Sequence, residues 1–278
     1  MAESRAELLK RLKAQSKEMR KLILKTSYNA GQGHVAPAYS AVEMTSALYF
    51  HAMKFDPKKP DWVDRDRLIF SAGHKCLNQY VALAMMGAIP MSLLDTFDQL
   101  DSCLGGHPIY GKCAGVDAST GSLGHGLPIG CGMAIAAKND KKDYRVYVIM
   151  GDGETHEGSV WEGALSANKF KLDNLVAIID YNKQTVDGPI DKVMPIEPFA
   201  DKWRAFNFAT KEIDGHNLEE VVSTLERLPF EKGKPNCIIA HTTKGKGVSF
   251  MTNNPAWHMK APNKQEFEAA MKEIEAMD

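Results

Sequence analysis

The feature that most constrains this chain is the alternation of short apolar strands with helices in its second half. Residues 145–150 form an apolar, β-branched run, and residues 175–179 form another. A helical pattern lies between them over 159–170, and two further strand patterns follow at 208–213 and 237–241. Short apolar strands that alternate with helices are typical of a mainly parallel sheet covered by helices on both faces. The sequence therefore predicts a three-layer, doubly wound α/β fold.

The first half is expected to be mostly helical, because its apolar residues recur at helical spacing between lysines and arginines. The expected elements are helices over 6–27, 41–53, 75–86, 91–100 and 127–138, and one short buried strand over 67–71. Asn263 and Glu266 have the spacing of a capping box for a last helix. No repeat or long linker interrupts the pattern, so we expect a single domain over residues 1–278.

The composition argues against several classes of protein. The formal net charge is -1, which does not fit the basic surface of a nucleic-acid binder. No apolar run has the length of a membrane span, and the charged N-terminus does not resemble a signal peptide. The five cysteines are odd in number and contain no CxxC pair, which argues against a disulfide framework. We expect a reduced, cytoplasmic protein that contacts neither nucleic acid nor membrane.

Polar residues follow two strands that we expect to be neighbours in the sheet. Gly151, Asp152 and Gly153 end one strand, and Asn182 follows the next. About thirty residues separate Asp152 from Asn182, which is enough for one crossover helix. In such sheets, ligands bind beyond the carboxyl ends of the strands. A carboxylate and an amide oxygen suit a hard cation such as Mg²⁺, which shares its oxygen ligands with phosphate groups. The glycines let a diphosphate approach the backbone closely.

These glycine motifs also have a purely structural interpretation. An Asp-Gly turn after a strand is common, so Gly151–Gly153 alone is more often structural than functional. The glycine loop 119–126 lacks the Gly-Lys-Ser/Thr end of a Walker loop and could be a helix-entry turn. The combination with Asn182 after a second strand is far more specific. Beside that pair, the glycine loop is expected to form a second wall for a phosphorylated or heteroaromatic cofactor.

Four histidines lie in loops marked by glycine or aromatic residues: His34, His74, His107 and His258. A lone loop histidine is more often solvated than catalytic. Four in one chain favour a functional role, because imidazole can donate to phosphate, sugar hydroxyls or an alkoxide near neutral pH. No histidine pair has the spacing of a zinc helix such as HExxH, so the sequence does not support a catalytic zinc.

At this point the motifs resemble those of a known family, the transketolases. The matching motifs occur in the family's order over about residues 20–265: Ser71–His74 with Tyr80, Gly106–Pro108, Ser119–Gly124, Gly151–Gly153 with Glu157 and Gly158, Asp180–Gly188, and Trp257 with His258. The resemblance implies the thiamine diphosphate-binding fold. It implies thiamine diphosphate as the cofactor, held by Mg²⁺ or another divalent cation such as Ca²⁺ or Mn²⁺.

The resemblance also implies roles for individual residues. Asp152 and Asn182 are expected to bind the metal, together with the backbone carbonyl of Gln184. The residues expected to bind the cofactor are His74, Gly121, Leu123, Gly151, Asp152, Gly153, Glu157, Asn182 and His258. The residues expected to be catalytic are His34, His107 and His258, which face the donor sugar, and Glu157, which links paired sites at a subunit interface.

Four further positions near these motifs carry weaker expectations. Lys244 and Lys246 lie in a Lys-Gly-Lys-Gly stretch, which indicates an anion contact only weakly because lysines in glycine loops are usually solvated. His125 stands where the family usually has Gln, and Met259 where a small residue is usual. Both departures point to a substrate choice that differs from the ordinary pentose phosphate reaction.

The resemblance covers the family's diphosphate-binding part, and the sequence ends at Asp278 before a pyrimidine-binding domain could begin. We therefore expect that domain on a C-terminal partner subunit, in an α2β2 assembly that is inactive without it. The expected reaction moves a two-carbon ketol unit from a ketose or ketose phosphate to an aldose acceptor.

Other interpretations remain open from the sequence. The chain could be the alpha subunit of a 2-oxo acid dehydrogenase or part of a deoxyxylulose-phosphate synthase, although the motifs at Ser71–His74 and Gly106–Pro108 fit transketolase better. From a different class, it could be a non-catalytic protein that regulates a partner, since fold and motif do not guarantee function.

Overall fold

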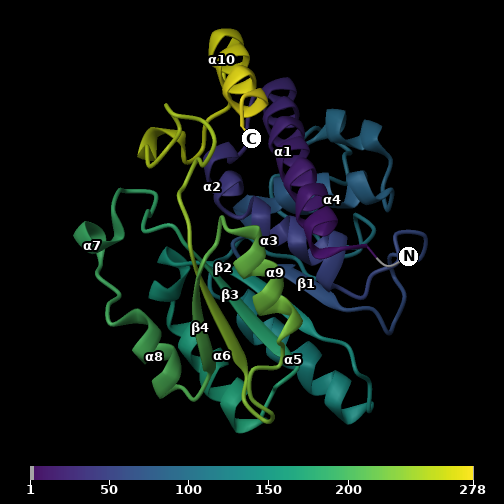
Figure 1. Ribbon diagram of the computed structural model, residues 1–278, viewed down its shortest axis with the longest axis vertical. Helices are drawn as coiled ribbons and strands as arrows, with labels where there is room; N and C mark the ends of the chain where they lie inside the picture. The colour runs from purple at the N-terminus through teal and green to yellow at the C-terminus, as the bar shows by residue number, and fades with distance from the viewer. Residues whose placement is uncertain (1–2, 278) are drawn as a thin grey trace.

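The computed structural model describes residues 3–277. Within them, five parallel strands form one sheet in the order β1-β2-β3-β5-β4 (Figure 1). The strands are β1 (Arg67–Phe70), β2 (Val146–Gly151), β3 (Leu175–Tyr181), β4 (Ala209–Asp214) and β5 (Asn236–His241). The register of β2 and β3 pairs Gly151 with Asp180, so the polar ends of these two strands lie side by side.

Helices cover both faces of the sheet, as the alternation of side chains along each strand requires. Tyr147 and Ile149 point into one apolar layer, whereas Val148 and Met150 point into the other. The first layer contains α1 (Arg5–Ala30), α2 (Val35–Ser40), α3 (Val42–Ala47), α4 (Cys76–Met86), α9 (Leu218–Glu226) and α10 (Lys264–Glu275). The second contains α5 (Gly126–Asn139), α6 (Gly158–Lys169), α7 (Ile190–Val193) and α8 (Phe199–Ala205). The predicted fold class is confirmed.

Most predicted elements are present with ends shifted by one to three residues, but two helices differ from the prediction. The helix expected over 41–53 is α-helical only to Ala47 and continues as a π turn over Leu48–Ala52. The helix expected over 91–100 is a short 3₁₀ helix, Met91–Thr96. Asp98, two residues after this helix, has a left-handed backbone conformation with φ 53°. Its carboxylate accepts a hydrogen bond from the backbone N–H of Gly106 at 3.0 Å.

The prediction of a capped last helix is confirmed. The Asn263 side chain accepts a hydrogen bond from the backbone of Glu266 at 2.9 Å, and the Glu266 carboxylate accepts one from the backbone of Asn263 at 2.9 Å. Figure 1 shows this helix, α10, beside α1. Between residues 3 and 277, no helix combines the length and the apolar character that crossing a bilayer requires.

A buried charged cluster joins three segments of the first layer. Arg20 of α1 pairs with Glu43 of α3 at 2.7 Å, and the Nδ1 atom of His216, after β4, lies 3.0 Å from the same carboxylate. Burial alone would raise the pKa of Glu43. The positive charge of Arg20 and the hydrogen bond from His216 outweigh burial, and they lower the pKa of Glu43 to about 2 from its ordinary 4.5. The ionised carboxylate therefore stabilises the fold.

We predict that Glu43→Gln lowers the free energy of unfolding at pH 7 by about 3 kcal/mol, because it leaves the buried Arg20 without its charged partner. The folded-state pKa is depressed, so this contribution is present above about pH 4.5 and is lost as the pH falls toward 2. Urea unfolding at several pH values measures it. The exposed Glu18→Gln is the matched control. Equal stabilities of the two variants at pH 7 would contradict the assignment.

Candidate active site

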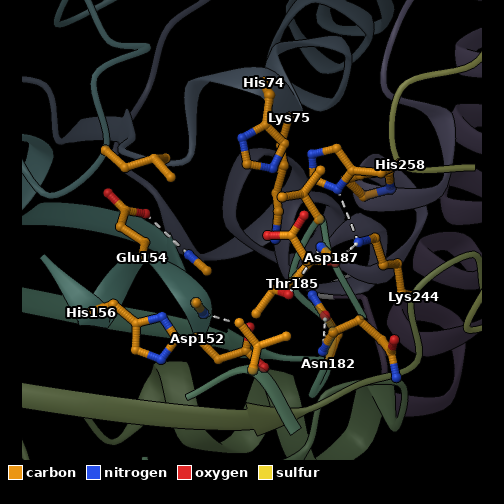
Figure 2. Close-up of a pocket in the computed structure, with 17 residues that line it drawn as sticks. His74, Lys75, Asp152, Glu154, His156, Asn182, Thr185, Asp187, Lys244 and His258 are labelled. Carbon is orange, nitrogen blue, oxygen red and sulfur yellow. Dashed lines mark hydrogen bonds between the residues drawn. The ribbon is translucent and has the colours of Figure 1, made fainter. Parts of the chain in front are cut away.

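A pocket of about 380 Å³ opens beyond the carboxyl ends of β2 and β3 (Figure 2). Eight of the residues predicted from the sequence line it: His74, Leu123, Gly151, Asp152, Gly153, Asn182, Gln184 and His258. They come from the loops after β1, β2 and β3, from the glycine loop before α5, and from the segment before α10. The parallel sheet thus gathers motifs that are far apart in the sequence.

The two predicted metal ligands are buried and already oriented by backbone groups. The Asp152 side chain is 1% exposed and accepts hydrogen bonds from the N–H groups of Gly153 at 2.7 Å and Lys183 at 2.5 Å. The Asn182 side-chain oxygen accepts one from the N–H of Gln184 at 3.0 Å. The backbone therefore fixes both side chains before any ligand arrives.

The chemistry of these groups fits a divalent cation held jointly with phosphate. Burial, and next the negative charge of Asp180, raise the pKa of Asp152 to about 7, so its carboxylate lacks a compensating cation. The side-chain oxygen of Gln184 is buried without a hydrogen-bond partner among the described residues. Residues 3–277 contain no cluster of three or more His, Cys, Asp or Glu side chains that could hold a metal alone. A cation here would need further oxygen ligands, which a diphosphate supplies.

The side chain of Asp180 connects several segments around the site through hydrogen bonds, a role that the sequence did not reveal. Its fully buried carboxylate accepts hydrogen bonds from Ser40 at 2.5 Å, from the side-chain amide of Asn182 at 3.1 Å, and from Lys75 and Thr242. Burial raises the pKa of Asp180, but the charge of Lys75 and these hydrogen bonds outweigh it, and the net pKa is lowered. Because the side-chain NH₂ of Asn182 donates to Asp180 and its oxygen accepts from the N–H of Gln184, the orientation of the amide is fixed.

Glu154 is a second residue that sequence reasoning missed. Its buried carboxylate accepts hydrogen bonds from the Ser71 hydroxyl, from the N–H of Gly124 at 2.9 Å and from the N–H of Gly151 at 3.1 Å. The Ser71 oxygen in turn accepts one from the N–H of Gly126 at 3.0 Å. A Cβ atom at Gly126 would lie 2.3 Å from that oxygen, so only glycine permits this approach. One carboxylate thus joins three glycine loops.

The four predicted histidines form one cluster, and two of them, His74 and His258, line the pocket. The His34 ring lies 5.3 Å from the His74 ring, 6.3 Å from the His107 ring and 5.4 Å from the His258 ring, measured between centroids. A parallel β-bridge between His34 and Lys260 brings the first histidine of the cluster next to the segment that carries the last one, His258. Tertiary structure therefore joins histidines that lie more than two hundred residues apart.

Three of these imidazoles are neutral at physiological pH. Burial, followed by the neighbouring His107, lowers the pKa of His34 to about 4. Burial and then Lys244 lower the pKa of His258 to about 3, and burial holds the pKa of His74 well below its usual value. A neutral imidazole carries one donor and one acceptor, so each ring can hold or receive a proton.

Other predicted residues lie outside the pocket lining. His34 and His107 border the pocket through the histidine cluster, and the backbone of Gly121 lies against the His107 ring, where a Cβ atom would be 3.2 Å from the ring. Glu157 is exposed and lies beside Gly124 of the glycine loop before α5. The individual roles of all predicted site residues remain predictions.

Comparison with known proteins decides the family. The family described as the thiamine diphosphate-binding domain of transketolase matches residues 12–278. This chain belongs to the transketolase family. It is 42% identical over 263 residues to one of the subunits of the apulose-4-phosphate transketolase from Phocaeicola vulgatus, covering 95% of this chain and 93% of that protein. It is also 42% identical over 264 residues to the 6-deoxy-6-sulfo-D-fructose transketolase subunit SqwG of a Clostridium species, covering 95% and 96%.

Solved transketolases share the fold. The transketolase of Leishmania mexicana superposes with a TM-score of 0.89 at 28% identity, and that of Campylobacter jejuni with 0.89 at 32% identity. Each match covers 95% of this chain but only 41% and 42% of the solved chain, respectively. The transketolase-family chain described here thus spans about two fifths of those transketolases, whereas it spans nearly all of the relatives named as subunits. The predicted resemblance is confirmed.

For this transketolase-family chain we predict that Glu154→Gln lowers the free energy of unfolding by about 1–3 kcal/mol, because an amide NH₂ would face a backbone N–H in place of an acceptor oxygen. Amide hydrogen exchange at Gly124 and Gly151 should accelerate. The exposed Glu162→Gln, on α6, is the control. If the two variants matched in both stability and exchange, Glu154 would not join the loops.

Proposed function

We propose that this chain holds thiamine diphosphate by its diphosphate group, through Mg²⁺ or a similar divalent cation, within a transketolase that has a second subunit. Its reaction transfers a two-carbon ketol unit from a ketose donor to an aldose acceptor. The observation that carries the proposal is that Asp152 and Asn182, just after the paired strands β2 and β3, line one pocket together with His74 and His258 of the histidine cluster.

The cofactor supplies the carbanion chemistry of ketol transfer when it is bound, and the chain supplies binding and orientation. Asp152, Asn182 and the backbone carbonyl of Gln184 would hold the cation. His74 and Gly153 line the same pocket and would lie against the diphosphate.

The remaining histidines would act on the sugar. His34, His107 and His258 would hold the sugar's hydroxyl groups in place. His34 and His258 are neutral at physiological pH, so each ring has one N–H that can donate a hydrogen bond to a sugar oxygen.

We propose a partner chain because several relatives of nearly full coverage are named as subunits. The lining of the pocket also includes two exposed apolar side chains, Val186 and Val193. Exposed apolar groups beside a binding site are typical of a surface that another protein covers. The partner would carry the pyrimidine-binding domain, and two copies of each chain would form the α2β2 assembly. Glu157, exposed at the start of α6, would lie at an interface between subunits.

The donor is proposed to be a ketose whose ketol end enters this pocket. Two relatives at 42% identity are named for two different sugars, apulose 4-phosphate and 6-deoxy-6-sulfo-D-fructose. The pocket residues of this chain are proposed to act at the ketol end of the sugar. The partner would therefore recognise the group at the other end. His125 and Met259, both exposed, are the positions of this chain where a difference in substrate choice would arise.

We propose that residues 1–278 act as one cofactor-binding domain in the cytoplasm; residues 1, 2 and 278 of that range lie outside the described residues. All five cysteines are free thiols in the structure, as is usual in a reducing compartment.

We predict that Asp152→Asn, in the complex with the partner, weakens Mg²⁺-dependent binding of thiamine diphosphate by about 100-fold or more, because the cation loses its only carboxylate ligand from this chain. Isothermal titration calorimetry measures it. Asp191→Asn on α7, where the side chain is exposed, is the matched control. Ketol transfer should require both chains.

Three outcomes would contradict parts of the proposal. Steady ketol transfer by this chain alone, with Mg²⁺ and cofactor, would remove the need for a partner. Decarboxylation of pyruvate without ketol transfer would favour a deoxyxylulose-phosphate synthase activity. Absence of metal-dependent cofactor binding in the complex would favour a non-catalytic protein.

A further inference from the structure

Lys244 departs from what its sequence context indicates. It lies in the Lys-Gly-Lys-Gly stretch after β5, where lysines are usually solvated, yet it is only 2% exposed and lines the pocket. Lys246, two residues later, is exposed as expected. A buried lysine carries a desolvation cost, so its contacts need an explanation.

The ammonium group of Lys244 has two defined acceptors. Its Nζ atom donates a hydrogen bond to the backbone carbonyl of Thr185 at 3.0 Å and lies 2.9 Å from Nδ1 of His258 (Figure 2). Thr185 directly follows Gln184, the predicted carbonyl ligand of the metal. Lys244 therefore connects the metal loop to the histidine of the last motif.

Only one placement of the protons fits the contact between Lys244 and His258. An ammonium group has three donors and no lone pair, so it can only donate. Nδ1 of His258 must then be the unprotonated nitrogen, and the proton of the neutral ring lies on Nε2. Among the described residues, Nε2 has no hydrogen-bond partner, and the ring lines the pocket. A neutral ring held in this way offers the pocket an N–H donor.

The electrostatics of the two groups agree with this arrangement. Burial, followed by the charge of Lys75, lowers the pKa of Lys244 to about 8, which still leaves it mostly protonated at pH 7. His258, with a pKa of about 3, is neutral there. A charged imidazolium at this position would face the ammonium group of Lys244 directly.

We infer that Lys244 is a positioning residue that fixes His258 in its Nε2–H tautomer, so that the ring presents a hydrogen-bond donor to an anionic or hydroxyl oxygen bound in the pocket. The inference rests on the proposed function for the identity of that oxygen, a diphosphate or ketol oxygen. In this state His258 donates and does not act as a base at Nε2. Without Lys244, both tautomers become accessible and the ring loses one of its fixed contacts.

The test is ¹⁵N NMR of the full chain labelled at histidine, with His258 assigned through His258→Gln. The wild-type chain should show a pyridine-type Nδ1 and a pyrrole-type Nε2 at His258. Lys244→Met should give a mixture of tautomers or the Nδ1–H form. Lys244→Arg, whose guanidinium group can also only donate, should restore the wild-type pattern. Lys246→Met removes a charge from the same loop without touching His258 and should leave the pattern unchanged.

A kinetic measurement in the complex with the partner separates positioning from general stability. Lys244→Met should lower kcat/KM by about tenfold, the loss expected for one oriented hydrogen bond, and Lys244→Arg should recover part of it. A melting curve of each variant monitors folding.

The wild-type spectrum alone can overturn the inference, even if a variant fails to fold: a proton on Nδ1 of His258 would refute it. An unchanged tautomer in folded Lys244→Met would refute it as well. The tautomer is read without turnover, so failure of ketol transfer would contradict the proposed function and leave this result standing.

Discussion

The site depends on one buried carboxylate at the end of the central strand. Asp180 accepts hydrogen bonds from Ser40 of α2, from Lys75 after β1 and from Thr242 after β5, so it joins three segments of the chain beneath the pocket. It also accepts a hydrogen bond from the side-chain NH₂ of Asn182 and thereby fixes the orientation of that amide. The pairing of β2 with β3 then places Asp152 beside it. Removing one partner from such a network leaves a buried charge uncompensated.

The same principle extends around the pocket, where each buried polar group orients its neighbour. Glu154 gathers the N–H groups of two glycine loops, and Lys244 fixes the ring of His258 while it holds the carbonyl of Thr185. Asp152 is the exception, because its raised pKa shows that its charge is not fully compensated within the chain. The proposed divalent cation, shared with a diphosphate, would supply the missing charge.

The sequence predicts what local pattern and strand order determine. Short apolar runs predict β2 and β3, and the polar residues at their ends predict that Asp152 and Asn182 meet. It could not predict which charged residues become buried, because Lys75 and Glu154 carry no local signal and their partners come from segments that only the folded sheet brings together. The prediction of a helix over 91–100 was wrong for a related reason. Its apolar Leu100 is 94% exposed, and Asp98 is committed to a loop contact.

The most direct test of the account is a crystal structure of this chain with its copurified partner, grown with thiamine diphosphate and Mn²⁺, with anomalous diffraction used to locate the metal. The account predicts one strong peak bonded to side-chain oxygens of both Asp152 and Asn182, with the diphosphate completing its ligands. A bound cofactor whose metal lies away from these two side chains, or a cofactor that binds elsewhere in the complex, would contradict it.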